Sequence, residues 1–309
     1  MSSRLSPVLV ALLFGCQEGS EPAVDAGTSD AALGGFVVSL VPADPEQGRA
    51  AYASVQGKVH DGTTPEDLTW TVEQEAGGCR LLVPHVPFCA VSCGGTAVCA
   101  EGGQCVPYPK ALDLGRVRVA GVGPSAFEME AVAGDYQPGA AVALPYPPFD
   151  EGGLVQVSAP GGALGAFALE ARGIAPLRFE QSPALVSGQP VQLTWTPPAQ
   201  AGTRIEVKVD ISHHGGAKGT IMCEVPDSGS LELPAAQVTR LLALGVAGFP
   251  TIVVTRVNSA TAAVRAGVIS LRLSSAVERP VQIEGLRSCK ADSQCPAGKV
   301  CRSDLTCQP

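Results

Sequence analysis

From residue 36 onward, apolar and polar residues alternate in short runs separated by turn-forming residues. A period of two is typical of β-strands with one buried face and one solvated face. The breaks are rich in proline, glycine and aspartate, as at Asp61-Gly62, and such residues end strands. In the first half of the chain the pattern predicts strands at Phe36–Leu40, Ala51–Val59, Leu68–Val72, Cys79–Val83, Arg116–Val119, Phe127–Glu130, Val155–Val157 and Phe167–Leu169.

The alternation continues in the second half, where the chain changes register near Pro176. One helix is predicted at Pro234–Leu244, because proline suits a first helical turn, Gly245 suits the C-terminal cap, and Val238, Leu241 and Leu242 form an apolar stripe. Together the elements predict an all-β fold with one short helix. The further strands are expected at Val191–Trp195, Ile205–Ile211, Ile221–Val225, Val253–Val257 and Val268–Leu273.

The N-terminus has the pattern of an export signal. Arg4 precedes an unbroken apolar run, Val8–Phe14, which is too short to span a bilayer as a mature helix. The sequence Leu-Phe-Gly-Cys that ends at Cys16 resembles the lipobox of bacterial lipoproteins. The resemblance implies that Cys16 is acylated and becomes the new N-terminus, and Gln17 after it implies the outer membrane. A plain secretory signal with an incidental cysteine is the alternative.

Cysteine spacing predicts a disulfide framework. The chain has 11 cysteines, and ten remain if Cys16 carries lipid, an even number as an oxidised, exported chain requires. Three cysteines in each of two blocks, 202 positions apart, have identical gaps, and a fourth cysteine precedes each block. This indicates a four-cysteine knot used twice, with three connectivities open in each. Cys79 and Cys223 are left to pair with each other. The knot cysteines are Cys89, Cys93, Cys99 and Cys105, then Cys289, Cys295, Cys301 and Cys307. Zinc is the alternative, but only Cys89 and Cys93 have a zinc-like spacing.

Two local resemblances refine the expected organisation. The sequence VQLTWTPP, followed by a turn and RIEVKVDI, resembles the B and C strands of an immunoglobulin-like or fibronectin type III sandwich. Asp292–Gly298 resembles the Cys-rich repeats called Dickkopf-like, and the chain as a whole is similar in style to uncharacterised Cys-rich lipoproteins of large-genome bacteria. Neither resemblance implies an activity.

We therefore expect two β-sandwich domains, immunoglobulin-like, with two small disulfide-rich knots. The expected boundaries are a signal peptide at 1–16, a flexible tether at 17–35, a β-sandwich at 36–175 with an inserted knot at 79–107, an immunoglobulin-like sandwich at 176–286 with the helix at 234–244, and a C-terminal knot at 287–309.

Charge and missing motifs narrow the function. The net charge of −8, with no basic cluster, argues against a nucleic-acid partner. No G-x-S-x-G, H-E-x-x-H or P-loop motif is present in the sequence, so we expect no catalytic residue, no cofactor and no metal. The prediction is a lipid-anchored, non-enzymatic cell-envelope protein with a binding or structural role. Its expected partners are the membrane, through the anchor, and an envelope protein or polysaccharide.

Two alternatives stay open. A carbohydrate-binding or hydrolytic surface protein would need a groove lined by Trp70, Trp195 or several of the four tyrosines. A metal-binding or redox envelope protein would centre on the cysteines and on His213-His214, with Cys223 or Asp227 as further ligands. Adjacent residues on a strand point to opposite faces, which disfavours the histidine pair as one site.

Overall fold

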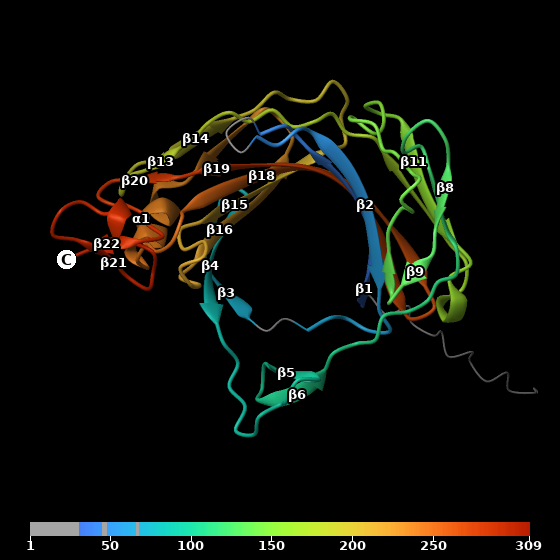
Figure 1. Ribbon diagram of the computed structural model, residues 1–309, viewed down its shortest axis with the longest axis horizontal. Helices are drawn as coiled ribbons and strands as arrows, with labels where there is room; N and C mark the ends of the chain where they lie inside the picture. Colours follow the sequence, from blue (N-terminus) through green and yellow to red (C-terminus); the bar gives the residue numbers. More distant parts are fainter. Residues whose placement is uncertain (1–30, 45–47, 66–67) are drawn as a thin grey trace, which may run out of the picture.

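The computed structural model describes residues 31–44, 48–65 and 68–309. The described chain is almost entirely β, with one helix and two short 3-10 turns, and it is built around a curved ten-stranded sheet (Figure 1). The mostly-β class predicted from the alternation is confirmed. Within these described residues, no helix is both long and apolar enough to cross a membrane.

The ten-stranded sheet joins strands from the beginning of the described chain to strands from its second half. All neighbouring strands run antiparallel except β1 and β19, which run parallel. The order across the sheet is β3 (Thr69–Ala76), β4 (Cys79–His85), β16 (Thr220–Pro226), β15 (Arg204–Asp210), β18 (Thr251–Val264), β19 (Gly267–Pro280), β1 (Ala32–Val41), β2 (Tyr52–Val59), β10 (Asp135–Tyr136) and β9 (Ala131–Val132).

Smaller elements cover the outer side of this curved sheet at both ends (Figure 1). At one end lies a four-stranded sheet of β12 (Phe167–Arg172), β11 (Leu154–Ala159), β7 (Val117–Ala120) and β8 (Phe127–Met129), with a 3-10 turn at Gly162–Leu164. At the other end lie β14 (Val191–Thr194) with β17 (Ser230–Leu233), β13 (Ala184–Leu185) with β20 (Gln282–Ile283), and helix α1 (Ala235–Ala243). Two further ribbons lie outside these layers: β5 (Ala97–Ala100) with β6 (Gln104–Pro107), which stands apart, and β21 (Val300–Cys301) with β22 (Cys307–Gln308), which follows a 3-10 turn at Asp292–Gln294 and lies against the body.

Two hydrophobic cores lie on the same face of the large sheet. Alternate residues of the β18–β19 hairpin enter both: Ile252, Val254 and Val277 belong to the core under α1, and Val264, Ile269, Leu271 and Leu273 to the core under the four-stranded sheet. The other face of the sheet is solvated except near its middle, where Val257 and Ser274 are buried. A one-sided core explains the strict alternation in these strands.

The cores do not follow the boundary expected at residue 176. Cys79 and Leu81 of β4 pack in the core built mainly from residues beyond 176, while the tip of the β18–β19 hairpin packs in the core built mainly from residues before it. Cys79 also lies in β4, outside the knot that was expected to begin there. The sheet is continuous and open, so the chain is not divided into two separate sheets.

Several boundaries shift while the elements persist. Strand β1 begins at Ala32, so residues 32–35 of the expected tether belong to the sheet; residues 17–30 and the signal peptide lie outside the described part. Helix α1 is as predicted, with Pro234 at its N-cap, Val238 and Leu241 buried, and Gly245 at φ 91° after its end. β18 extends seven residues beyond Val257 to Val264 through a polar and alanine-rich run, because β19 pairs with it along its full length.

A buried ion pair lies where the two cores meet. Arg256 of β18 and Asp227, in the turn between β16 and β17, are each only 2% exposed in their side chains. The Arg256 guanidinium donates to both Asp227 oxygens, at 2.5 and 3.3 Å. Asp227 also accepts the indole N–H of Trp195 at 2.7 Å and the hydroxyl of Thr203 at 2.9 Å. The charges are therefore paired and hydrogen-bonded, as burial requires.

The same junction holds the segment that passes from one core to the other. Arg256 donates to the carbonyls of Ala175 at 3.2 Å and Thr196 at 2.6 Å. Ser275, which lies opposite Arg256 in the hairpin, accepts the Leu177 N–H at 2.9 Å. Asn258 donates to the Arg172 carbonyl at 3.0 Å. Side chains from the middle of the β18–β19 hairpin thus provide hydrogen-bond partners for backbone groups of the segment that passes between the cores, which has no strand partner of its own.

We predict that Asp227→Ala destabilises the fold by about 3–5 kcal/mol, because it leaves the Arg256 charge buried without its partner. Glu206→Gln is the matched control: the Arg272–Glu206 pair is also bidentate, at 2.7 Å for both contacts, but its side chains are about one-third exposed. That control should cost no more than about 1 kcal/mol. Urea denaturation of the two variants checks this, and equal losses would contradict it.

Candidate functional site

All ten cysteines of the described residues form disulfides. Cys79–Cys223 joins β4 to β16 inside the second core, where the two residues lie directly opposite each other. The predicted pairing of these two leftover cysteines is confirmed. Cys16, the expected site of acylation, lies outside the described residues.

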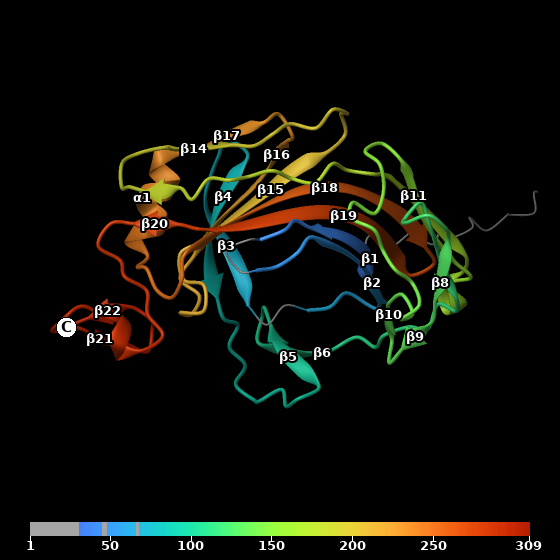
Figure 2. The same cartoon turned by 45° about the horizontal axis from the view of Figure 1, so that its top comes forward.

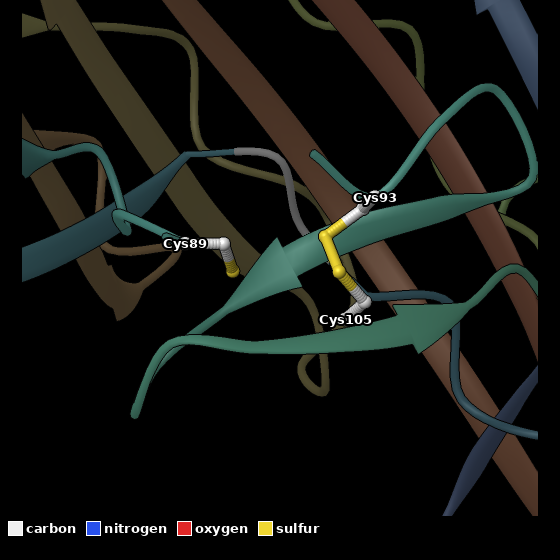
Figure 3. Close-up of side chains that lie close together, drawn as sticks. All are labelled: Cys89, Cys93 and Cys105. Carbon is white, nitrogen blue, oxygen red and sulfur yellow. A yellow bond between two sulfur atoms is a disulfide. The ribbon is translucent and has the colours of Figure 1, made fainter. Parts of the chain in front are cut away.

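The two knots share one connectivity, which spacing alone left open. In the first knot (Cys89–Cys105) the bonds are Cys89–Cys99 and Cys93–Cys105; Figure 3 shows the latter, which joins the loop before β5 to β6. In the second knot (Cys289–Cys307) they are Cys289–Cys301 and Cys295–Cys307. First pairs with third and second with fourth in both, so the 202-residue repeat holds in the covalent structure.

The candidate metal ligands are engaged elsewhere. Sulfur atoms of each knot gather within 4.8 Å of one another, but all of them are in disulfides and none is a thiolate. The ring centroids of His213 and His214 lie 3.9 Å apart, with the rings tilted by 49°, in the loop between β15 and β16. Cys223 is bonded to Cys79, and Asp227 to Arg256, so neither is free to complete a site with these histidines.

The aromatic residues do not form the expected platform. Trp195 is 6% exposed and packs in the second core, where its indole N–H is bound by Asp227. Trp70 is half-buried in β3, at the edge of the large sheet. Tyr136 is fully buried in the first core. A sugar-stacking surface centred on Trp195 is therefore excluded, which weakens the carbohydrate alternative.

The largest solvated feature is the inner face of the ten-stranded sheet, by which we mean the face opposite the two cores. Strand parity places exposed Lys208, Met222 and Arg80 in one row across β15, β16 and β4. Ion pairs link strands there: Arg204–Glu224 joins the neighbouring strands β15 and β16 at 2.5 Å, and Arg272–Glu206 joins β19 to β15 across the intervening β18. The face is thus polar and charged, with both signs interspersed.

A strap of residues 86–111 crosses this face and carries the first knot (Figure 1, Figure 2). It leaves β4 near one edge of the sheet and returns beside the end of β2, where Ala111 bridges His60. The Lys110 N–H donates to the Asp61 carboxylate at 2.7 Å, and the Asp61 N–H donates to the Lys110 carbonyl at 2.9 Å. Two hollows lie on the sheet: one of about 490 Å³ lined by Arg80, Arg204 and Glu224, and one of about 350 Å³ beside Lys58 and Tyr136.

Next to the smaller hollow, Tyr136 fixes the segment at Asp113 and Leu114 through hydrogen bonds. Its hydroxyl accepts the Leu114 N–H at 2.6 Å and donates to Asp113 at 3.3 Å. Burial raises the pKa of this hydroxyl, and the Asp113 charge raises it further, against the opposing effect of the Leu114 N–H. The folded state therefore favours the neutral phenol.

The sequence did not predict that the polar positions of these strands form one continuous surface, the inner face. The signal was present in Arg204, Glu206 and Lys208, the polar positions between the buried ones, but nothing local showed that β4, β15 and β1 join one sheet. The strap was foreseen only as a knot, because its span depends on that same long-range pairing.

Comparison with known proteins adds no relative: no protein-family model matches the chain, and no curated protein matches it.

We predict that the disulfides differ in accessibility to reductant. Cys105 is exposed, whereas Cys79 and Cys223 are 0% and 4% exposed, so mild reductant should open the first knot while Cys79–Cys223 stays intact. Alkylation followed by peptide mass spectrometry gives the order. Early loss of Cys79–Cys223 would contradict the assignment of this bond to the core.

Replacing both cysteines of a pair should show the same contrast in stability. Cys79–Cys223 spans 144 residues and Cys89–Cys99 spans 10, so the chain-entropy relation gives losses of about 5 and about 3 kcal/mol respectively. Because the first knot stands apart from the main sheet, the smaller loss should fall on the knot alone, and the unfolding midpoint of the main sheet should decrease only when Cys79–Cys223 is removed. Urea denaturation followed by tryptophan emission measures the difference, since Trp195 reports on the second core.

Tyr136→Phe should lower stability at neutral pH by about 1–3 kcal/mol, because the buried Leu114 N–H loses its acceptor. A folded-state pKa above the unfolded value of 10.0 contributes stability below that value and loses it as pH rises further. The variant should therefore lose less stability above pH 10 than the unsubstituted chain. Tyr52→Phe, at a 48% exposed position, is the control and should follow the unsubstituted chain in urea denaturation at both pH values.

Proposed function

We propose that the protein is a lipid-anchored, non-enzymatic component of the bacterial cell envelope, held at the outer membrane through Cys16. The observation that carries the proposal is the pairing of ten cysteines in five disulfides, which leaves one cysteine, at the end of the apolar N-terminal run. Stable structural disulfides form outside the reducing cytosol. Two or more acyl chains on one residue would supply durable attachment, since each buried CH₂ adds about 0.8 kcal/mol.

The inner face supports a binding role within that setting. It is open, polar and bridged by the strap, and it presents paired charges of both signs. Such a face suits an envelope protein or polysaccharide better than a nucleic acid, because the chain is acidic and the face has no uniform positive charge. In this proposal the sheet is a binding or structural surface without catalytic residues.

We also propose that each core belongs to a β-sandwich that shares the long sheet with the other, the second one immunoglobulin-like. β14 and β15, which carry the VQLTWTPP and RIEVKVDI sequences, lie in different sheets with Trp195 buried between the layers, as B and C strands do.

The test is the intact mass of membrane-extracted protein, with and without reductant. We expect a mature chain beginning at Cys16 with acyl groups attached, and a gain of ten hydrogen atoms on reduction, two for each of the five disulfides. Cys16→Ala should remove the acyl mass and release the protein from membranes without changing the disulfide count. A cytoplasmic chain with free thiols would contradict the proposal.

A further inference from the structure

The two knots share a disulfide pattern but differ in chemistry. In the first, the stretch Val86–Pro109 contains a single charged residue, Glu101. The second contains five charged residues between Cys289 and Cys307: Lys290, Asp292, Lys299, Arg302 and Asp304. Because both knots solve the same folding problem, the difference in charge does not follow from the knot itself.

The first knot is also where exposed apolar side chains gather. Phe88 is 84% exposed, Val91 76% and Val86 69%, and these are the largest exposed fractions among its apolar residues. We call the exposed large apolar residues of the first knot and of the strap on either side of it the apolar tip; they are Val86, Phe88, Val91, Val106 and Tyr108. Single exposed apolar residues are normal, but a group on one small projecting element marks a contact surface.

The disulfides keep the apolar tip outward. With Cys89–Cys99 and Cys93–Cys105 fixing the loop, Phe88 and Val91 cannot fold back to cover each other in a core. The knot projects from the body in both views (Figure 1, Figure 2). The second knot lies against the body instead: Ser288 donates to the Gly248 carbonyl at 2.6 Å, and Lys290 lies over the Phe249 ring.

The base of the first knot lies beside the start of the sheet. His60 donates to the Leu33 carbonyl at 2.8 Å and bridges Ala111, at the end of the strap. Fifteen residues separate Ala31 from Cys16, and a chain of that length spans at most about 50 Å. If Cys16 is acylated, the apolar tip is therefore confined to the neighbourhood of a bilayer.

We infer that the apolar tip inserts into the lipid surface, as a second and shallow membrane contact beside the acyl anchor. The inference rests on the proposed lipid anchor. A lipid surface fits better than a protein partner because the tip is nearly uncharged and the strap that carries it ends at Ala111, beside His60 and Leu33 at the start of the sheet. Aromatic and aliphatic side chains on a neutral support gain free energy at the boundary between headgroups and acyl chains.

The acyl anchor dominates overall affinity, so the test must report on the tip itself. Phe88→Trp places a fluorophore on the apolar tip, and Val300→Trp places one on the second knot, at a position that is 41% exposed. Each full-length, membrane-extracted variant is reconstituted on vesicles of phosphatidylethanolamine and phosphatidylglycerol, with and without brominated acyl chains. Emission of the unsubstituted protein, from Trp70 and Trp195, is subtracted.

We expect Phe88→Trp emission to shift to shorter wavelength and to be quenched at least twofold more by brominated lipid than Val300→Trp emission. Equal quenching of the two variants on vesicles that carry the protein would overturn the inference while leaving the anchor intact. An emission shift that occurs in native envelope membranes, but not in vesicles that contain no other protein, would assign the tip to a protein partner. That result would also overturn the inference.

Failure of the anchor is seen separately, in the intact mass of the same samples. If no acyl group is present, the spectra still decide the inference: quenching of Phe88→Trp at high vesicle concentration supports it, and unchanged emission refutes it. Val91→Trp, at a similarly exposed position, repeats the measurement independently of Phe88.

Discussion

Arg256 and Asp227 set the constraint around which the described chain is arranged. A buried guanidinium needs a carboxylate and several carbonyls, and here those acceptors come from the turn after β16, from the crossing at Ala175 and from Thr196. Each acceptor belongs to a different stretch of chain, so satisfying one charge fixes the relative position of three segments. An apolar residue at 256 would leave that crossing backbone without donors.

The polar junction also explains how one sheet carries two cores. Along the inward row of β18, the residues change from Ile252 and Val254 through Arg256 and Asn258 to Ala260 and Val264. The hydrophobic surface is interrupted at the middle and resumes beyond it. Because β18 and β19 stay paired through this interruption, the cores remain joined by backbone hydrogen bonds as well as by side chains.

Local physics was enough for most of the long strands, for the helix and for the Cys79–Cys223 bond, but it left the connectivity within each knot open. The alternation of apolar and polar residues predicted strands such as Ile205–Ile211, and the proline and glycine signals predicted α1. The even number of cysteines left Cys79 and Cys223 to pair with each other. The sequence could not show that β1 lies parallel to β19, since this contact joins residues far apart in the chain. It also could not show the extension of β18 through Asn258–Ala263, a polar and alanine-rich run that is a strand because β19 pairs with it beyond the end of the pairing with β15. The inner face and the strap depend on these contacts.

The position of β1 has a mechanical consequence. β1 is an inner strand, bonded to β2 on one side and to β19 on the other over most of its length. A pull transmitted through the residues before Ala32 would act along the axis of β1, while its hydrogen bonds lie across that axis. Rupture would then require both ladders to shear at once rather than open one rung at a time. A molecule moored through this end would resist drag by the collective strength of its central strands.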